Sequence, residues 1–411
     1  MNRKLSISVL GITIASLVVL GVCTIVNQPK YKVIDIKGDK SELGEVSFIT
    51  QSYEGLYSNT QTTTSKDGFE VNKYSNEIKQ PNQYYDLING NKDIFKYGYT
   101  ENLVYGDSNN VGYLEELGVN YINSEKATLD FRIVNKNIKT KKINEYNLTL
   151  PDTFDSDTNF EHGFIIGIKD EDVYILCSGS TDLEHSKNGQ IKDNKGIFMN
   201  VYKFNLNTKQ LKKQSSMEKN SSNNELIIIN NQISFENNGK LYTIVESYPK
   251  QDEKSGKIYL VYYDINRNKF DYIKEPLITN IESESCRNIK YNIEDDKLYL
   301  MTQHDIDWKN TNINQYVVDL NSNKVIDVNK NYNVEKLNKS ARIENFRVID
   351  GKIYICMDNY NIHDEQSNNS NKHKNTIIVI DEKSNRVIYM GEYINYKAQR
   401  ANNIILKNNE I

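Results

Sequence analysis

One pattern recurs along most of this 411-residue chain, and it constrains the fold more than any other feature. Its marker is a tyrosine inside a short β-branched run, found at Tyr174, Tyr242, Tyr299 and Tyr354. Successive markers are separated by 68, 57 and 55 residues. A recurrence of this length is the signature of a repeat architecture, in which each copy folds as one unit and packs on its neighbours.

The clearest copy runs from Asn345 to Glu392. Two alternating apolar runs flank Asp350-Gly351, a two-residue signal for a tight β-hairpin. A polar loop leads to a third run at residues 376–380, and a turn leads to a fourth at residues 386–390. This order predicts a four-stranded antiparallel meander.

The same order is legible at residues 289–326, 232–273 and 164–211, and a weaker fifth copy spans Leu103 to Ile143. The strands are nearly continuous apolar runs, as expected when both faces of a sheet are covered. Radial stacking of such sheets covers both faces and leaves only short edges, which is the β-propeller solution. Residues from about 35 to 405 have room for six or seven units. We therefore predict an all-β fold, a β-propeller of six or seven four-stranded blades.

These repeats resemble the β-propellers of extracytoplasmic bacterial repeat proteins. The resemblance rests on the order of strands, because the chain has no signature such as the WD dipeptide, and it implies a fold without an activity. The segment from Ile34 to Val71 holds two or three further strands, one of them a candidate to close the ring against the last blade. A pair of β-sandwiches or an elongated β-solenoid, built from the same strands, is the structural alternative.

The N-terminus predicts a membrane anchor. Arg3 and Lys4 precede a stretch from Leu5 to Val26 that contains no charged residue, long enough to cross a bilayer as a helix. A short cationic start before a single span usually remains in the cytoplasm, which would place the rest of the chain outside. Two alternatives remain open: a cleaved signal peptide, and a lipoprotein acylated at Cys23.

The domain prediction follows from these two features. Residues 1–30 form the cytoplasmic N-terminus and the transmembrane signal anchor, and residues 31–411 form one extracytoplasmic domain, since no Pro/Gly/Ser-rich linker divides them. Beyond the anchor only Cys177, Cys286 and Cys356 remain, so no disulfide framework is expected. Lys and Arg number 51 and Asp and Glu 55, a balance that provides no basic field for nucleic acid.

No established catalytic or cofactor motif is present, and we expect no cofactor. The run from Asp107 to Gly118 fails as a calcium loop, because Val111 occupies a ligand position and Gly118 stands where a glutamate is needed. Three loops between second and third strands combine histidine with acidic residues, and their metal-ligand candidates are His185, His304, Asp305, His363 and Asp364. Solvated polar loops also collect such residues, so a metal site is a hypothesis.

Three functions are compatible with these features. The first is a non-enzymatic sensor or scaffold of the bacterial cell envelope, anchored in the cell membrane, that binds an envelope protein, peptide or other envelope component through its loops. The second is an envelope hydrolase, lyase or metal-dependent enzyme that works in the funnel of the propeller. The third is an accessory subunit of a membrane complex.

Overall fold

The structure is a computed structural model that describes residues 31–53, 59–74, 87–88, 90–95, 103–155, 164–181, 184–185, 191–193, 196–222, 225–249, 255–281, 289–305, 310–335, 341–359, 373–395 and 399–406. Within these ranges the fold is all-β, with one short 3-10 helix, η1 (Lys40–Leu43). The predicted anchor and Cys23 lie outside them. No helix among the described residues has the length and apolar character needed to cross a membrane.

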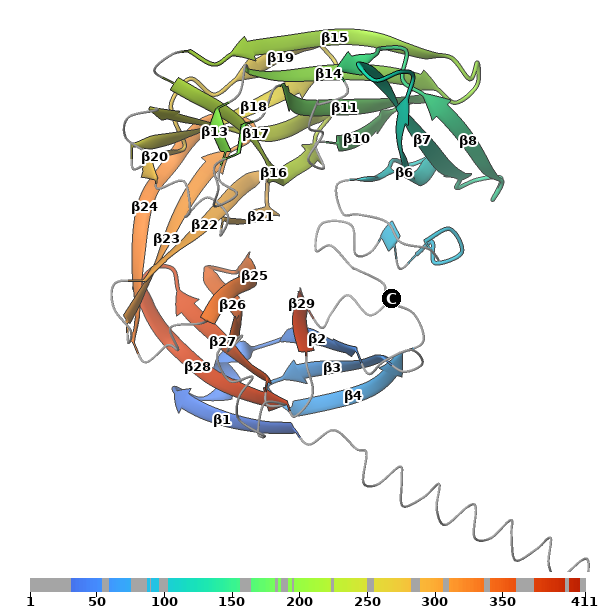
Figure 1. Ribbon diagram of the computed structural model, residues 1–411. Coiled ribbons are helices and arrows are strands. Elements are labelled where there is room, and N and C mark those ends of the chain that lie inside the picture. Colours follow the sequence, from blue (N-terminus) through green and yellow to red (C-terminus); the bar gives the residue numbers. More distant parts are fainter. Residues whose placement is uncertain are drawn as a thin grey trace, which may run out of the picture.

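The described strands form six antiparallel meanders arranged around a centre, as predicted for a β-propeller (Figure 1). We number these blades along the chain. Blade 1 contains β2 (Val46–Tyr53), β3 (Asn59–Ser65) and β4 (Gly68–Tyr74). Blade 2 contains β5 (Val104–Gly106), β6 (Asn110–Tyr121), β7 (Lys126–Asn137) and β8 (Ile143–Thr149), and β9 (Phe154–Asp155) pairs with β7. Blade 3 contains β10 (Phe164–Lys169), β11 (Asp172–Thr181), β14 (Gly196–Asn205) and β15 (Leu211–Asn220).

The remaining blades follow the same plan. Blade 4 contains β16 (Glu225–Asn237), β17 (Lys240–Pro249), β18 (Gly256–Asp264) and β19 (Lys269–Tyr272), and β20 (Ile278–Ile281) pairs with β18. Blade 5 contains β21 (Lys290–Glu294), β22 (Lys297–Asp305), β23 (Asn310–Asp319) and β24 (Lys324–Glu335). Blade 6 contains β25 (Ala341–Ile349), β26 (Lys352–Asn359), β27 (His373–Asp381) and β28 (Arg386–Asn395). The weak fifth repeat of the sequence is blade 2, and the sandwich and solenoid alternatives do not form.

The first described strand joins the last blade, and the last described strand joins the first blade. Strand β1 (Tyr31–Lys37) pairs with β28 and becomes a fifth, outer strand of blade 6. Strand β29 (Gln399–Leu406) pairs with β2 and completes blade 1 from the centre of the ring. The sequence predicted closure by an early strand against the last blade, and β1 confirms it. The insertion of β29 was not predicted.

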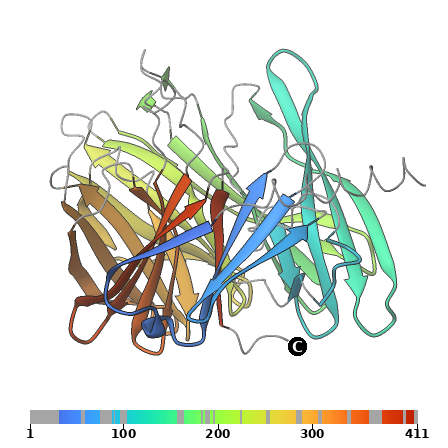
Figure 2. The ribbon, with the colours of Figure 1, turned by 90° about the horizontal axis from the view of Figure 1, so that it is seen from below.

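The meander gives the ring two different faces (Figure 2). Turns between first and second strands and between third and fourth strands lie on one side, which we call the hairpin face. The strand ends that lead into the connections between second and third strands, and from one blade to the next, lie on the other side, which we call the loop face. Strand β1 begins on the loop face, because Tyr31 pairs with Asn395 at the end of β28.

Apolar side chains fill the spaces between neighbouring blades. Examples of fully buried rings are Phe131 in blade 2, Phe204 in blade 3, Phe235 in blade 4 and Phe346 in blade 6. The marker tyrosines all lie in the second strand of a blade and are buried. The free thiols of Cys177 and Cys356 are also buried in this core.

The turns of the hairpin face follow one rule. In five blades the third and fourth strands are joined by a segment that begins with Asp or Asn and ends with Asn or Lys at positive φ: residues 137–141, 205–209, 264–268, 319–323 and 381–385. The second residue of each segment donates its backbone N–H to a carbonyl of the first hairpin in the same blade, as Leu206 does to Glu171 at 2.9 Å and Ile138 does to Asn109 at 2.7 Å. These bonds fix the two hairpins of a blade against each other.

Candidate functional site

The histidine-bearing loops are only partly placed. His185 ends β12 (Glu184–His185), which pairs with β13 (Ile191–Asp193), and His304 and Asp305 end β22. These strand ends belong to blades 3 and 5 and lie on the loop face, as the topology predicted, but blade 4 stands between them. The structure describes the backbone alone at these three positions, and His363 and Asp364 lie outside the described residues. No group of three potential metal ligands occurs among the described side chains, and the metal site stays a prediction.

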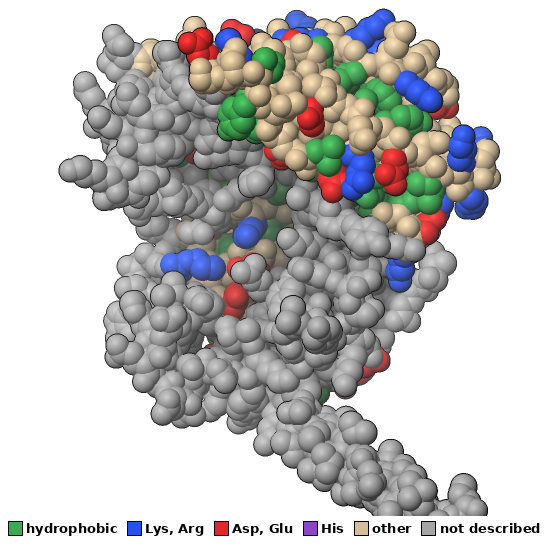
Figure 3. Space-filling model, turned by 45° about the vertical axis from the view of Figure 1, so that its right-hand side comes forward, with side chains coloured by type: hydrophobic (Ala, Val, Ile, Leu, Met, Phe, Trp, Pro, Cys, Tyr) green, Lys and Arg blue, Asp and Glu red, His purple; other side chains and the backbone are tan. Residues whose placement is uncertain are grey.

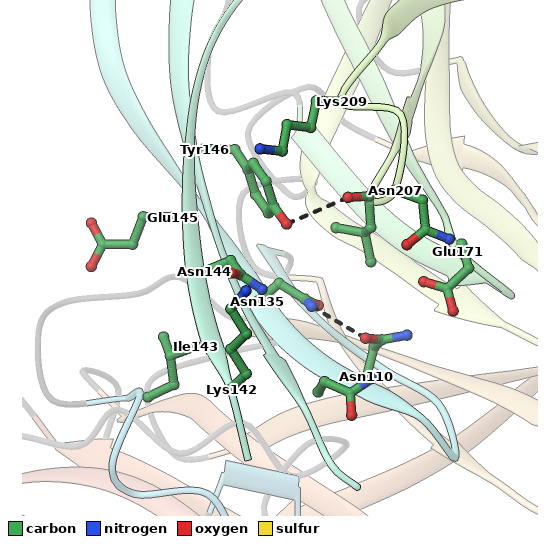
Figure 4. Close-up of a pocket in the computed structure, with 12 residues that line it drawn as sticks. Asn110, Asn135, Lys142, Ile143, Asn144, Glu145, Tyr146, Glu171, Asn207 and Lys209 are labelled. Carbon is green, nitrogen blue, oxygen red and sulfur yellow. Dashed lines mark hydrogen bonds between the residues drawn. The ribbon is translucent and has the colours of Figure 1, made fainter. Parts of the chain in front are cut away.

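A polar pocket of about 530 Å³ opens on the hairpin face between blades 2 and 3 (Figure 4). This volume falls within the range of ordinary small-molecule sites, roughly 300 to 1,000 Å³. Its walls are turns and strand ends of both blades. The lining residues are Asn110, Asn135, Asn137, Lys142, Ile143, Asn144, Glu145, Tyr146, Glu171, Leu206, Asn207 and Lys209.

Strand register explains why amide side chains gather here. Asn135 of β7 is the cross-strand partner of both Gly112 of β6 and Asn144 of β8, and Asn110 is the partner of Asn137. Cross-strand partners and alternate residues share a face of the sheet, so these asparagines point to the same side of blade 2. That side faces the turns of blade 3.

A chain of hydrogen bonds leads from the core to the pocket. The buried Tyr105 hydroxyl donates to Oδ1 of Asn135 at 2.9 Å, and Nδ2 of Asn135 donates to Oδ1 of Asn110 at 3.2 Å. Gly112 makes room for this arrangement, because a Cβ there would lie 2.5 Å from the Tyr105 oxygen. These hydrogen bonds fix the orientation of each amide, and therefore which side its donor nitrogen and its acceptor oxygen occupy.

This series of hydrogen bonds ends at a donor group that has no acceptor. Asn110 is 1% exposed, and its Nδ2 has no hydrogen-bond partner among the described residues. Figure 4 shows this nitrogen turned away from Asn135, toward the side of the pocket where Glu171 lies. A buried donor without an acceptor costs about 1 to 3 kcal/mol, so most such groups in folded proteins are paired. Asn110 therefore marks a place where an acceptor from outside the chain would be stabilised.

The turn that carries Asn110 is itself rigid. Oδ1 of Asp107 accepts the backbone N–H groups of Asn109 and Asn110, both at 2.7 Å. The backbone of Asp107 in turn donates to the Asn110 carbonyl at 2.8 Å. The Asp107 carboxylate is thus engaged within its own turn, and it holds Asn110 at the start of β6.

The opposite wall is equally well fixed. Oδ1 of Asn205 accepts the N–H groups of Asn207 at 3.1 Å and Thr208 at 2.8 Å, and Lys209 adopts φ of 58°. On the blade 2 side, Oδ1 of Asn137 accepts the N–H of Thr140 at 2.9 Å, and Lys141 adopts φ of 59°. Both walls are therefore formed before any ligand arrives.

Tyr146 joins the two blades at the pocket. Its ring packs edge-on against Phe204 of blade 3, with centroids 5.1 Å apart, and its hydroxyl donates to the Leu206 carbonyl at 3.5 Å. Burial raises the pKa of Tyr146, and the nearby Glu171 carboxylate adds to that effect. The hydroxyl is neutral at physiological pH and remains a hydrogen-bond donor.

The lining also contains charged residues of both signs. The lining contains two lysines, Lys142 and Lys209, and two glutamates, Glu145 and Glu171. Arg132 lies 3.6 Å from Glu145, in a pair whose carboxylate is largely exposed. Figure 4 shows Glu145 pointing away from the pocket, on the side of β8 opposite Asn144, so Glu171 is the lining carboxylate that lies beside the two lysines.

The end of β6 at the loop face forms a second exposed surface of blade 2. Leu117, Val119 and Tyr121 are exposed, Tyr121 to 64%. Figure 3, in which this side of the molecule comes forward, shows hydrophobic side chains set among charged ones. The described residues do not include a group that covers these side chains.

Sequence reasoning missed the pocket. Its signal is the similarity of the two wall turns, Asn137-Ile-Lys-Thr-Lys141 and Asn205-Leu-Asn-Thr-Lys209, which occupy the same position in consecutive repeats. Equivalent turns of consecutive blades are neighbours in a propeller. That comparison would have placed both turns at one boundary.

Comparisons with known proteins identify no family. No family model and no curated protein matches the sequence. Among solved structures, the chain is similar to cobalt-substituted Synechocystis ACO, with a TM-score of 0.37 and 9% identity over 89% of this chain and 93% of that one. It is also similar to the β-propeller domain of the Trilobed protease from Pyrococcus furiosus, with a TM-score of 0.31 and 9% identity over 85% and 83%. The corresponding values for the Nup133 β-propeller domain of Vanderwaltozyma polyspora are 0.32 and 10%, over 90% and 98%. Similarity at this level carries no information about function.

Proposed function

We propose that this protein is a non-enzymatic binding protein of the cell envelope, tethered to the outside of the membrane by its N-terminal segment, with the pocket between blades 2 and 3 as its ligand site. The observation that carries the binding role is the unpaired Nδ2 of Asn110 in a preformed polar pocket. Preformed walls favour binding, because little conformational entropy is lost when a ligand orders them.

The position of β1 supports the tethered arrangement. The apolar stretch of the sequence ends at Val26, and β1 begins at Tyr31 on the loop face. The four residues between them span at most about 14 Å when fully extended. A membrane anchor at residues 5–26 would hold the loop face near the bilayer, and the pocket on the hairpin face would point away from it.

Protease treatment of intact cells tests the tether. The full chain should sediment with membranes and be digested from outside, whereas a chain lacking residues 1–30 should not sediment with membranes. Protection of the full chain from the external protease, or release of the full chain into the soluble fraction, would contradict this part of the proposal.

Hydrogen exchange on the full chain in lipid nanodiscs tests the pocket. The protein is incubated separately with a wall-polymer fraction, a peptide fraction and lipid vesicles from the same envelope. Slower exchange confined to residues 107–112, 137–146 and 206–209 with one of the first two supports the proposed site. Slower exchange only on the loop face, or no change with any material, excludes the pocket as the ligand site.

A further inference from the structure

We infer that the ligand of this pocket is a neutral saccharide, an inference that rests on the binding role proposed above and names the class of its ligand. Three properties of the lining lead to it: the mixture of donors and acceptors, the lack of a cluster of like charges, and the orientation imposed on Asn110.

The mixture of donors and acceptors fits hydroxyl groups. An asparagine side chain offers two N–H donors and a carbonyl acceptor, and a hydroxyl both donates and accepts. Five asparagines line the pocket, from three strands and two turns. A ligand with several neighbouring hydroxyls can pair with such a surface at every position, whereas an apolar ligand would leave these groups unpaired.

The lack of a cluster of like charges among the described lining residues disfavours strongly ionic ligands. A phosphate or polycarboxylate is held by clustered Arg or Lys, usually with bidentate geometry. Here the two lysines of the lining come from different blades, none of the described arginines lines the pocket, and the carboxylate of Glu171 lies among them. An anionic polymer would meet Glu171, and a cationic one would meet the lysines. A neutral polyol can accept from the lysines and donate to Glu171.

The orientation of Asn110 supplies the specific contact. Its Oδ1 is already occupied by Asn135, so its buried Nδ2 can only donate. The ligand must therefore present an acceptor at this point, such as a hydroxyl, ring or glycosidic oxygen. A site built around a buried polar group discriminates against ligands that cannot pair with it, because the group would then remain unsatisfied.

The test uses the full chain in lipid nanodiscs, because a detergent with a sugar headgroup would compete. Saturation-transfer NMR and calorimetry are run with cellotriose, maltotriose and the trimer of N-acetylglucosamine as neutral probes. Trigalacturonate, the glucosamine trimer and trialanine are the charged or non-sugar probes. We expect at least one neutral trimer to bind, and the three comparison probes to bind at least ten-fold more weakly.

Asn110→Asp tests the contact itself. It keeps the Oδ1 acceptor used by Asn135 and replaces the inward donor with an acceptor, so affinity for the neutral trimer should fall at least ten-fold. Asn207→Asp changes an exposed turn of the opposite wall and should weaken binding several-fold. It tests the same site if Asn110→Asp does not fold. Asn147→Asp adds the same charge on β8 outside the pocket and should bind like the wild type.

The outcomes separate the ligand class from the binding role. Equal binding of a neutral trimer to wild type, Asn110→Asp and Asn207→Asp would overturn the site. Binding of only a charged probe or trialanine, with loss in the same variants, would overturn the neutral-saccharide class and leave the binding role standing. Exchange protection by an envelope fraction without binding of any neutral trimer would also overturn the class alone.

Discussion

The hydroxyl of Tyr389 donates to Oδ1 of Asp35 at 2.9 Å, and this bond joins the first described strand to the last blade across 354 positions of sequence. Tyr389 lies in β28 and is fully buried, and its hydroxyl also lies 3.2 Å from that of Tyr393. The bond therefore anchors β1 at the edge of blade 6, next to the segment that the sequence predicts to enter the membrane.

Tyr389→Phe should loosen this attachment. The change keeps the ring in the core and removes the hydroxyl's bonds to Asp35 and Tyr393, which together contribute about 1 to 2 kcal/mol. We expect the free energy of unfolding to fall by about that amount, and amide exchange of β1 to accelerate more than that of β26 or β27. The control is Tyr121→Phe on the exposed end of β6, which should leave both quantities unchanged. Equal exchange in β1 of wild type and Tyr389→Phe would show that the hydroxyl does not hold the strand.

Arg347 links the closing strand β29 to blades 5 and 6. Its guanidinium donates from Nη2 to Oε2 of Glu294 in blade 5 at 3.0 Å and from Nη1 to the carbonyl of Ile404 in β29 at 3.3 Å. Because Arg347 itself belongs to blade 6, one side chain connects three blades. The side chain of Arg347 is 15% exposed, and that of Glu294 29%, so this ion pair is shielded more than a surface pair.

Arg347→Met should destabilise the protein by about 2 kcal/mol, since hydrogen bonds to charged groups contribute about 1.5 to 3 kcal/mol and Glu294 loses its partner. The matched control is Lys352→Met, which breaks the more exposed pair with Glu42 at 2.9 Å and should cost less than about 1 kcal/mol. Urea denaturation measures both. A larger loss for Lys352→Met than for Arg347→Met would contradict the role of Arg347 in closure.

The parts of the fold that could be predicted from the sequence are those determined by contacts between residues close in sequence. The Asp350-Gly351 hairpin was predicted correctly, because two adjacent residues at φ of 50° and 73° determine the turn. The pairing of β29 with β2 could not be predicted in the same way, since it joins Val46 to Leu406 and both strands are short segments of mixed polar and apolar residues with many possible partners. The repeat spacing predicted the blades, whereas the strand that completes blade 1 depends on this long-range pairing.

The candidate site was unpredictable for a different reason. Each asparagine of the pocket is an ordinary turn or strand residue in its own repeat, and only the contact between blades 2 and 3 makes Asn110 and Asn207 line one cavity. The direction of Nδ2 in Asn110 depends on Tyr105 and Asn135, which follow no motif. The histidine-bearing loops, in contrast, could be recognised in the sequence by their residue types. Residue types alone do not determine which side chains lie close together in the fold.

The repeated turn of the hairpin face makes a prediction about Asn385, which ends the segment from Asp381 and adopts φ of 53°. Left-handed backbone costs an ordinary residue about 1 to 2 kcal/mol, whereas glycine, and to a lesser degree asparagine, tolerates it. We expect Asn385→Ala to lower the free energy of unfolding by about 1 kcal/mol and Asn385→Gly to stay within about 0.5 kcal/mol of wild type. Thermal and urea unfolding of the three proteins measure this, and equal stability of the Ala and Gly variants would exclude backbone strain as the cause.

Acid should weaken the boundary between blades 4 and 5 through Asp296. Its carboxylate accepts side-chain N–H groups from Asn238 at 2.8 Å, Asn321 at 3.2 Å and Asn237 at 3.3 Å. These bonds, that from Asn321 foremost, lower the pKa of Asp296 below its usual value of 3.8. A carboxyl with a depressed pKa in the folded state stabilises the fold above its unfolded pKa, and that contribution is lost as the pH falls through the folded pKa.

The melting temperature should therefore drop between pH 5 and pH 3 in the wild type, and Asp296→Asn should reduce the size of this drop. Asparagine suits the substitution, because it tolerates the left-handed φ of 56° at this position and does not titrate. The control is Asp170→Asn, the same change at a left-handed turn position of blade 3, which should keep the slope of the wild type. If Asp296→Asn and wild type lose the same number of degrees over this range, the amide contacts across the boundary between blades 4 and 5 do not contribute to acid sensitivity.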